Sequence, residues 1–89
     1  MKINKIRKKI DKIDKKIIKL LFKRKELARK ISKIKKKSKM EIVQKDREKE
    51  VIKKVNDYNN RYKKDRLSPL FINNIFKQII KESRRIQGW

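Results

Sequence analysis

The sequence predicts an all-α domain of three helices, the first of them unusually long, which pairs with a second copy of itself. A single Gly and a single Pro among 89 residues leave few tight turns, which disfavours a β-rich fold. Apolar residues recur at spacings of three and four, the period of amphipathic helices. The first periodic stretch is also too long for the rest of so short a chain to cover.

The composition is strongly basic and excludes several kinds of chemistry. Residues 1–89 are enough for one domain, and 32 Lys and Arg against 10 Asp and Glu give a formal net charge of +22. Because the chain has no Cys and no His, disulfides, thiol chemistry, imidazole bases and ordinary zinc sites are excluded. No apolar run approaches the roughly 18 residues of a membrane span, and no signal peptide is visible. We therefore expect a cytoplasmic protein without a membrane partner.

The first helix is expected over residues 2–37, and its apolar seam follows a heptad pattern without a slip. The seam consists of Ile3, Ile6, Ile10, Ile13, Ile17, Leu20, Arg24, Leu27, Ile31 and Ile34. Arg24 alone breaks its apolar character. A helix of about 36 residues is roughly 54 Å long, whereas a compact globule of this size is only about 30 Å across. The seam therefore needs a partner, and a second copy of the chain is the simplest one.

Two shorter helices complete the chain after a loop predicted over Ser38 to Gln44. The second helix is expected from Asp46 to about Tyr62, with an inner face of Glu48, Val51, Ile52, Val55, Tyr58 and Tyr62. After a charged connector, Ser68 is the expected N-cap and Pro69 the first residue of the third helix. The inner face of this helix consists of Ile72, Phe76, Ile79, Ile80, Ser83, Ile86 and Gln87.

Polar residues on or beside these inner faces are the candidate functional residues, because a buried unpaired charge costs several kcal/mol. They are Arg7, Arg24, Lys35, Glu48, Ser83 and Gln87. Each also has an ordinary structural explanation: a register-setting polar residue, a snorkelling side chain, a carboxylate near a helix N-terminus, or a frayed C-terminus. Taken singly, none of them identifies a function.

Spacing along the first helix brings the cations into relation with one another. Arg24 and Lys35 are about 16 Å apart along the helix axis, so their long side chains can converge on one small ligand. Arg7 is about 25 Å from Arg24 and cannot reach that ligand within one chain. In an antiparallel two-fold dimer, Arg7 of one chain approaches Arg24 and Lys35 of the other. Such a cluster suits a small polyanion.

The order of motifs resembles that of the all-helical chorismate mutases. Residues 6–14 look like the opening of that family's first helix, and residues 21–28 look like its mid-helix arginine motif. Three further motifs follow in the family's order and spacing: Ile34-Lys35, Asp46-Arg47-Glu48, and the stretch from Phe76 to Gln87. The resemblance covers nearly the whole chain. It implies an isomerase of aromatic amino-acid biosynthesis, an intertwined three-helix homodimer that converts chorismate to prephenate.

The resemblance implies catalytic roles for five residues. Arg7 of the partner chain and Arg24 would bind the two substrate carboxylates. Lys35 would contact a carboxylate and the ether oxygen of the bond that breaks, and Gln87 would donate to that same oxygen. Glu48 would accept a hydrogen bond from the ring hydroxyl.

Three more residues would contact the substrate by the same resemblance. Arg47 and Ser83 would line the end of the site that holds the ring carboxylate. Gln44 stands where the family usually has Asp, at the start of the second helix, and its backbone N–H would meet the ring hydroxyl. A backbone contact survives this exchange, although Gln caps a helix less well than Asp, by about 1 kcal/mol.

The implied chemistry suits what the chain lacks. The rearrangement is unimolecular and needs no nucleophile, base, metal or cofactor, so we expect none. Catalysis must come from holding the compact conformer of the substrate and from stabilising the negative charge that develops on the ether oxygen.

Three alternatives are open on sequence alone. A basic helical dimer could bind nucleic acid through phosphate contacts, but the cations are spread over all faces and aromatic residues for base stacking are few. We therefore expect no specific nucleic-acid partner. An isochorismate pyruvate lyase would share this fold and much of this pocket. A purely structural coiled coil is disfavoured by the polar groups on the inner faces of the second and third helices.

Overall fold

A computed structural model describes residues 2–38 and 45–88, and within these ranges the chain is helical without a strand. The elements are α1 (Lys2–Ser38), α2 (Lys45–Asn60), the short 3-10 helix η1 (Lys63–Asp65) and α3 (Pro69–Ile86). The predicted all-α class with three helices is confirmed. The predicted loop before α2 falls mostly on residues 39–44, which lie outside the described residues.

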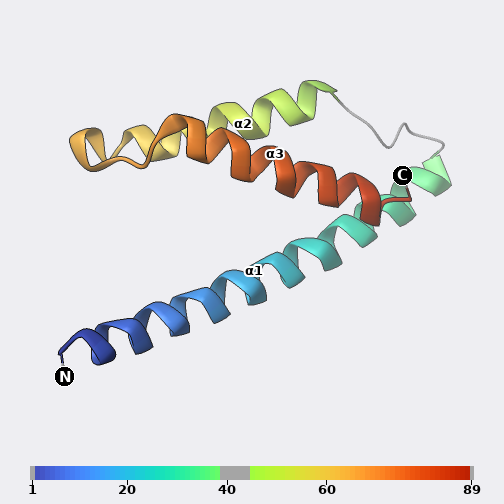
Figure 1. The fold of residues 1–89 in the computed structure, drawn as a ribbon. Coiled ribbons are helices and arrows are strands. Elements are labelled where there is room, and N and C mark those ends of the chain that lie inside the picture. Colours follow the sequence, from blue (N-terminus) through green and yellow to red (C-terminus); the bar gives the residue numbers. More distant parts are fainter. Residues whose placement is uncertain (1, 39–44, 89) are drawn as a thin grey trace.

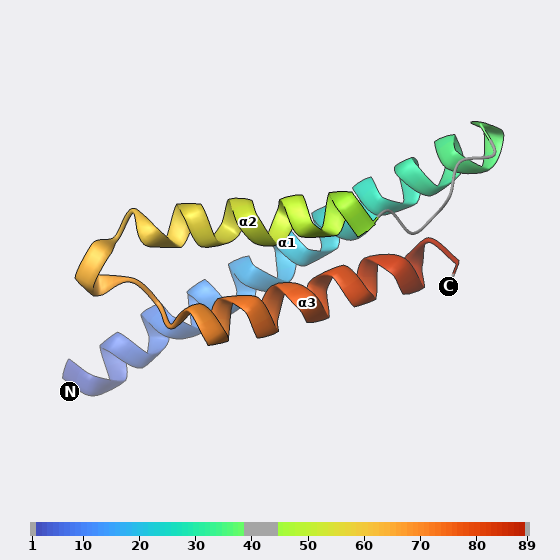
Figure 2. The ribbon, with the colours of Figure 1, turned by 90° about the horizontal axis from the view of Figure 1, so that it is seen from above.

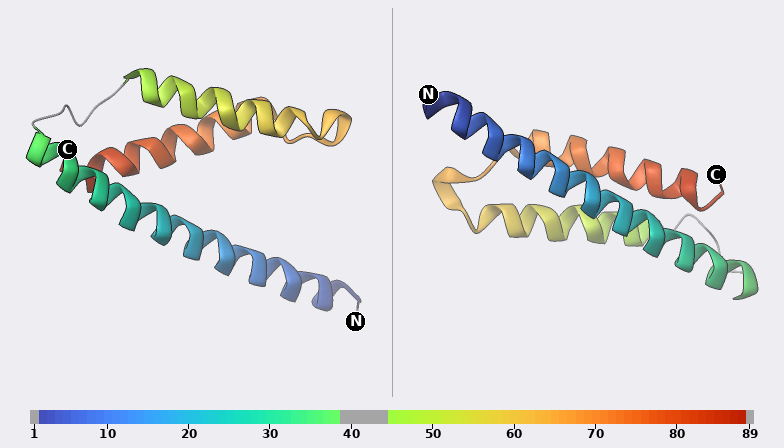
Figure 3. Two further views of the ribbon diagram at one scale, coloured as in Figure 1. Left: turned by 180° about the vertical axis from the view of Figure 1, so that it is seen from behind. Right: turned by 90° about the horizontal axis from the view of Figure 1, so that it is seen from below.

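α1 is one continuous rod that extends beyond the rest of the chain (Figure 1). The molecule measures 56 × 26 × 17 Å along its principal axes, and its radius of gyration is 16.3 Å. A compact chain of this length has a radius of gyration of only about 12 Å. The N-terminal half of α1 diverges from α2 and α3 (Figure 3), so the rest of the chain does not cover it.

The apolar seam of α1 is exposed along its whole length in the single chain. Ile6 is 56% exposed, Leu20 61% and Ile34 61%, and the other apolar members of the seam are similarly exposed. The side of α1 that meets α3 is the neighbouring one, where Ala28, Ser32 and Lys35 are buried. The seam is therefore not used for packing within the chain.

α2 and α3 run antiparallel to each other (Figures 1 and 2). The buried Asn59 side chain forms hydrogen bonds across the segment that connects them. The amide nitrogen of Asn59 donates to the Leu67 carbonyl at 2.8 Å, and the Leu67 N–H donates to the Asn59 amide oxygen at 2.9 Å. Ser68 caps α3 as predicted, accepting from the Phe71 N–H at 3.4 Å, and Pro69 is the first helical residue. These bonds set the point at which α3 begins and its direction away from α2.

The core is small and lies along α3. Among the described residues, the buried apolar side chains are Ala28, Ile72 and Ile80. The predicted inner face of α3 is confirmed, since all of its members are buried or half-buried. The predicted inner face of α2 is wrong at its C-terminal end, where Tyr58 and Tyr62 are each 59% exposed. None of the described helices is both long enough and apolar enough to cross a membrane.

Candidate active site

A hollow of about 330 Å³ opens between the C-terminal part of α1, the start of α2 and the end of α3. It brings together six of the predicted site residues: Arg24, Lys35, Arg47, Glu48, Ser83 and Gln87. The rest of its lining consists of Leu27, Ala28, Ile31, Val51, Ile80 and Arg84. Residues that are far apart in the sequence therefore meet around one space with largely apolar walls.

One predicted site residue, Arg7, does not line this hollow. Arg7 lies on the exposed N-terminal part of α1, which the views show diverging from the other helices. It does not belong to the lining, as expected from its separation from Arg24 along the helix. Gln44 lies outside the described residues.

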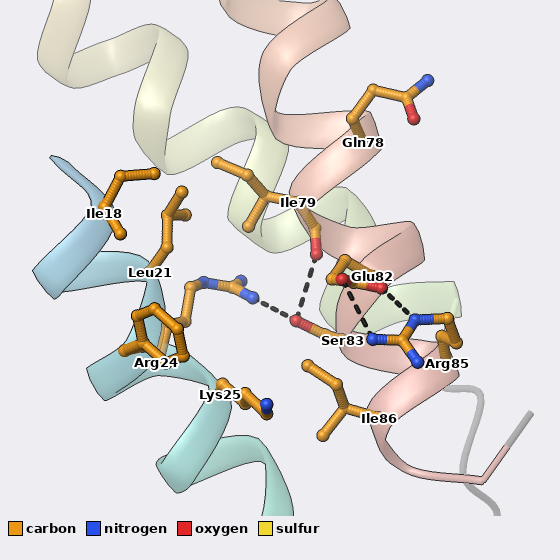
Figure 4. A pocket seen from close by; sticks show the side chains of 11 residues that line it. Ile18, Leu21, Arg24, Lys25, Gln78, Ile79, Glu82, Ser83, Arg85 and Ile86 are labelled. Atoms are coloured by element: carbon orange, nitrogen blue, oxygen red, sulfur yellow. Dashed lines mark hydrogen bonds and ion pairs between the residues drawn. The ribbon is translucent and has the colours of Figure 1, made fainter. Parts of the chain in front are cut away.

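Arg24 is linked to α3 through Ser83. Nη1 of Arg24 donates to Oγ of Ser83, which itself donates to the Ile79 carbonyl at 3.1 Å (Figure 4). Arg24 and Ser83 also line a second, largely apolar hollow of about 360 Å³, which Figure 4 shows. Because the Ser83 hydroxyl is engaged by a cation and a carbonyl, with no base beside it, it is suited to binding and not to nucleophilic attack.

Arg24 lies in an environment that favours an anion. Burial, and after it repulsion from Arg47, lowers the pKa of Arg24. None of the ion pairs formed among the described residues involves Arg24. A bound carboxylate would offset both the burial and the repulsion, so the site is electrostatically prepared for one.

Lys35 and Gln87 form the second polar pair of the hollow. Lys35 is only 8% exposed, and its Nζ donates to Oε1 of Gln87 at 3.5 Å. Ser32, also buried, donates to the backbone carbonyl of Gln87 at 3.4 Å. Since the amide oxygen of Gln87 faces Lys35, its NH₂ group is the part that can donate to a ligand.

Gln87 is held at the end of α3 and is not frayed. It is the C-cap, and its backbone N–H donates to the Ser83 carbonyl at 3.0 Å. Gly88 follows with φ of 102°, a left-handed conformation that glycine adopts readily after a helix. The N–H of Gly88 donates to the Arg85 carbonyl at 3.2 Å. This closed terminus fixes where the Gln87 side chain leaves the helix.

Glu48 is bound by an arginine of α3. Nε of Arg84 donates to Oε1 of Glu48 at 2.5 Å, and Nη2 donates to Oε2, a bidentate arrangement. These hydrogen bonds raise the pKa of Arg84. Arg47 turns to the exposed side of α2, where its Nη1 donates to Oε1 of Glu50 at 2.7 Å.

The charged lining of the hollow is strongly unbalanced. In the part of the chain that the structure describes, its cations are Arg24, Lys35, Arg47 and Arg84, and its one carboxylate is Glu48. Such a lining, with apolar walls and converging donors, fits a small dianionic ligand. Among the described residues, no group of three or more acidic, His or Cys side chains is placed to hold a metal ion.

Two residues of the site were not predicted from the sequence. Arg84 follows Ser83 directly, and this proximity to a predicted site residue was a possible signal. Its place beside the inner face, however, is also that of an outward-facing cation. Ser32 lies between Ala28 and Lys35 on the buried side of α1, where the spacing of four and three could have identified it. Both act through another side chain or backbone group of the site.

Comparison with curated proteins and with solved structures returned no match. The family model for chorismate mutase type II matches residues 6–88, which include the whole lining of the hollow. The all-helical architecture agrees with that family. The chain therefore belongs to the chorismate mutase type II family.

Proposed function

We propose that this protein is a chorismate mutase that rearranges chorismate to prephenate, acting as a cytoplasmic homodimer in aromatic amino-acid biosynthesis. The observation that carries the proposal is the pairing of Lys35 with Gln87, within the same hollow as Arg24. The hollow thereby offers a carboxylate-binding guanidinium, a buried ammonium and an uncharged amide donor. These are the groups that a dianionic ether substrate requires.

The reaction needs charge stabilisation and no proton transfer. In the rearrangement the ether C–O bond breaks while a new C–C bond forms, and no group leaves the molecule. Negative charge develops on the ether oxygen as its bond to carbon lengthens. The Lys35 ammonium and the Gln87 amide act as preorganised donors to that oxygen.

The other residues of the hollow hold the reactive conformer. Arg24, supported by Ser83, binds one carboxylate, and Arg7 of the second copy binds the other. Arg47 and Ser83 line the end of the site that holds the ring carboxylate, and Glu48 accepts from the ring hydroxyl. Gln44 contributes its backbone N–H near the same hydroxyl. Fixing both carboxylates and the hydroxyl brings the two carbons that will bond within reach of each other, which removes an entropic part of the barrier.

The second copy of the chain completes the site. The exposed seam of α1 offers an apolar surface much larger than those that monomeric proteins usually leave in water. Pairing two such seams antiparallel around a two-fold axis covers them and carries Arg7 of each chain to the hollow of the other. Each of the two sites then has a second carboxylate-binding guanidinium.

The first test is chorismate consumption by wild type and Lys35→Ala, measured in parallel by absorbance. We expect wild type to form prephenate, and Lys35→Ala to lose about 10²-fold or more in kcat as well as in kcat/KM, because the donor acts mainly in the transition state. Lys36→Ala, which removes the same charge from the exposed neighbouring position, is the control. Pyruvate release from isochorismate by wild type without prephenate formation would instead identify a lyase, and affinity for duplex DNA without turnover a nucleic-acid-binding protein.

A further inference from the structure

The ion pair between Glu48 and Arg84 lines two cavities at once. One is the candidate active site, and the other is an outer groove of about 750 Å³ between α2 and α3. The outer groove is rich in ammonium groups, which belong to Lys45, Lys49, Lys53, Lys77 and Lys81. The Glu48 carboxylate therefore stands between the substrate site and a set of competing cations.

The Glu48 carboxylate needs a partner that fixes its orientation toward the hollow. The chain carries only 10 acidic residues against 32 basic ones, so the lysines of the outer groove other than Lys53, which is paired with Asp57, compete for a scarce carboxylate. The Glu48 side chain has three rotatable bonds, and an ion pair with a flexible lysine would leave its orientation loosely defined. A carboxylate directed into the outer groove could not accept from a ligand in the hollow.

Arg84 fixes this orientation through the geometry of its hydrogen bonds. Its Nε and Nη2 bind the two oxygens of Glu48 side by side, which defines the plane of the carboxylate as well as its distance. Each oxygen keeps a further lone pair with which to accept from a ligand. The Glu48 side chain is 21% exposed and that of Arg84 39%, so the carboxylate is the more enclosed of the two groups.

We propose that Arg84 is a positioning residue for recognition of the substrate's ring hydroxyl. It holds the Glu48 carboxylate toward the hollow, away from the lysines of the outer groove, and so makes binding depend on a hydroxyl at that point of the ring. This inference rests on the proposed function, in which Glu48 accepts from the ring hydroxyl. Arg84 itself does not touch the reacting atoms.

The test compares Arg84→Met and Arg84→Lys with Arg85→Met as the matched control. Arg85 is the next residue of α3, carries the same charge, and pairs with Glu82 on an exposed surface. We expect Arg84→Met to lower kcat/KM for chorismate about tenfold, mostly through KM, because the hydroxyl contact is present in ground and transition states alike. Arg84→Lys should recover part of this loss, since it restores charge without the fork. Arg85→Met should resemble wild type.

Two further measurements separate positioning from a merely structural link between α2 and α3. In a Glu48→Gln background, Arg84→Met should cause no further loss of kcat/KM, because the two residues act as one unit. With a chorismate analogue that lacks the ring hydroxyl, Arg84→Met and wild type should have the same kcat/KM. A structural link would lower turnover of both substrates equally, and all assays are made below the unfolding temperature of each variant.

The outcomes also distinguish the two levels of the proposal. If wild type converts chorismate and Arg84→Met remains within twofold of it, or loses equally with the hydroxyl-free analogue, only the role of Arg84 is overturned. If wild type does not convert chorismate, the proposed function fails and the role of Arg84 fails with it.

Discussion

At the scale of single residues, the proposed function depends most on the neutrality of Gln87. A donor beside an oxygen that becomes negative must keep its hydrogen at every working pH, and an amide does so. The side chain is fixed by the closed end of α3 and by the contact of its oxygen with Lys35. Its NH₂ group therefore has one defined direction.

Replacing Gln87 by Glu should convert a pH-independent donor into a titrating one. An ionised carboxylate would repel the developing charge and has no hydrogen to donate, whereas the protonated acid can donate. We expect Gln87→Glu to be active only at acid pH, with kcat/KM rising as the pH falls through the pKa of the new carboxyl group, while wild type stays comparatively flat. Gln78→Glu, the same exchange at an exposed position of α3, is the control. An unchanged profile in a folded Gln87→Glu dimer would remove Gln87 from the site.

At the scale of elements, the connection between α2 and α3 depends on one buried side chain. Asn59 is 6% exposed and satisfies both the N–H and the carbonyl of Leu67. The Asn59 side chain offers both a donor and an acceptor. It therefore satisfies the two backbone groups of Leu67 as a second backbone segment would. The orientation of α3, and with it the position of Ser83 and Gln87, depends on this junction.

Asn59→Ala should therefore destabilise the fold much more than Asn60→Ala does. Two hydrogen bonds to the backbone of Leu67 disappear, which should lower the free energy of unfolding by about 1–3 kcal/mol. Asn60→Ala removes only the exposed hydrogen bond to Arg66 and should lower it by less than about 1 kcal/mol. Urea denaturation at one fixed protein concentration compares the two variants. Equal losses would show that Asn59 does not hold the junction.

At the scale of the whole molecule, the long helix α1 connects assembly to catalysis in the proposed dimer. The C-terminal part of α1, including Arg24, Leu27 and Ile31 of the seam, lines the hollow, while Arg7 and the N-terminal part of the seam are exposed in the single chain. In the proposed dimer, the two ends of each α1 contribute to different sites, so two copies are needed to complete either one. Dimer formation and activity should then be inseparable.

Mixing Arg7→Ala with Arg24→Ala protein should restore activity that neither variant has alone. After subunit exchange, each heterodimer holds one site in which both substitutions fall and one site in which both arginines are intact. Sedimentation equilibrium should give twice 11.0 kDa, and the melting temperature should rise with protein concentration. A mixture no more active than its parents, once exchange is verified, would show that Arg7 does not act in the partner's site.

Much of the fold was predictable because it depends on local pattern. The spacing of apolar residues predicted three helices, and the start of α3 at Pro69 with Ser68 as its cap follows from neighbouring residues alone. The end of α2 was predicted two residues too late. The periodicity of Tyr58 and Tyr62 continued past Asn60, but the turn that ends the helix depends on Asn59 and its distant partner Leu67.

From the sequence alone, spacing along the first helix predicted that Arg24 and Lys35 can converge on one small anion and that Arg7 cannot reach it within one chain. Helical period and rise are properties of the backbone, so residues on one face and distances along one helix can be worked out without the fold. The pairing of residues from different helices could be seen only once the helices were packed together: Arg24 with Ser83, Lys35 with Gln87, and Glu48 with Arg84. Such pairs depend on how far each helix is rotated about its own axis and where it crosses its neighbour, and packing of the whole chain sets both.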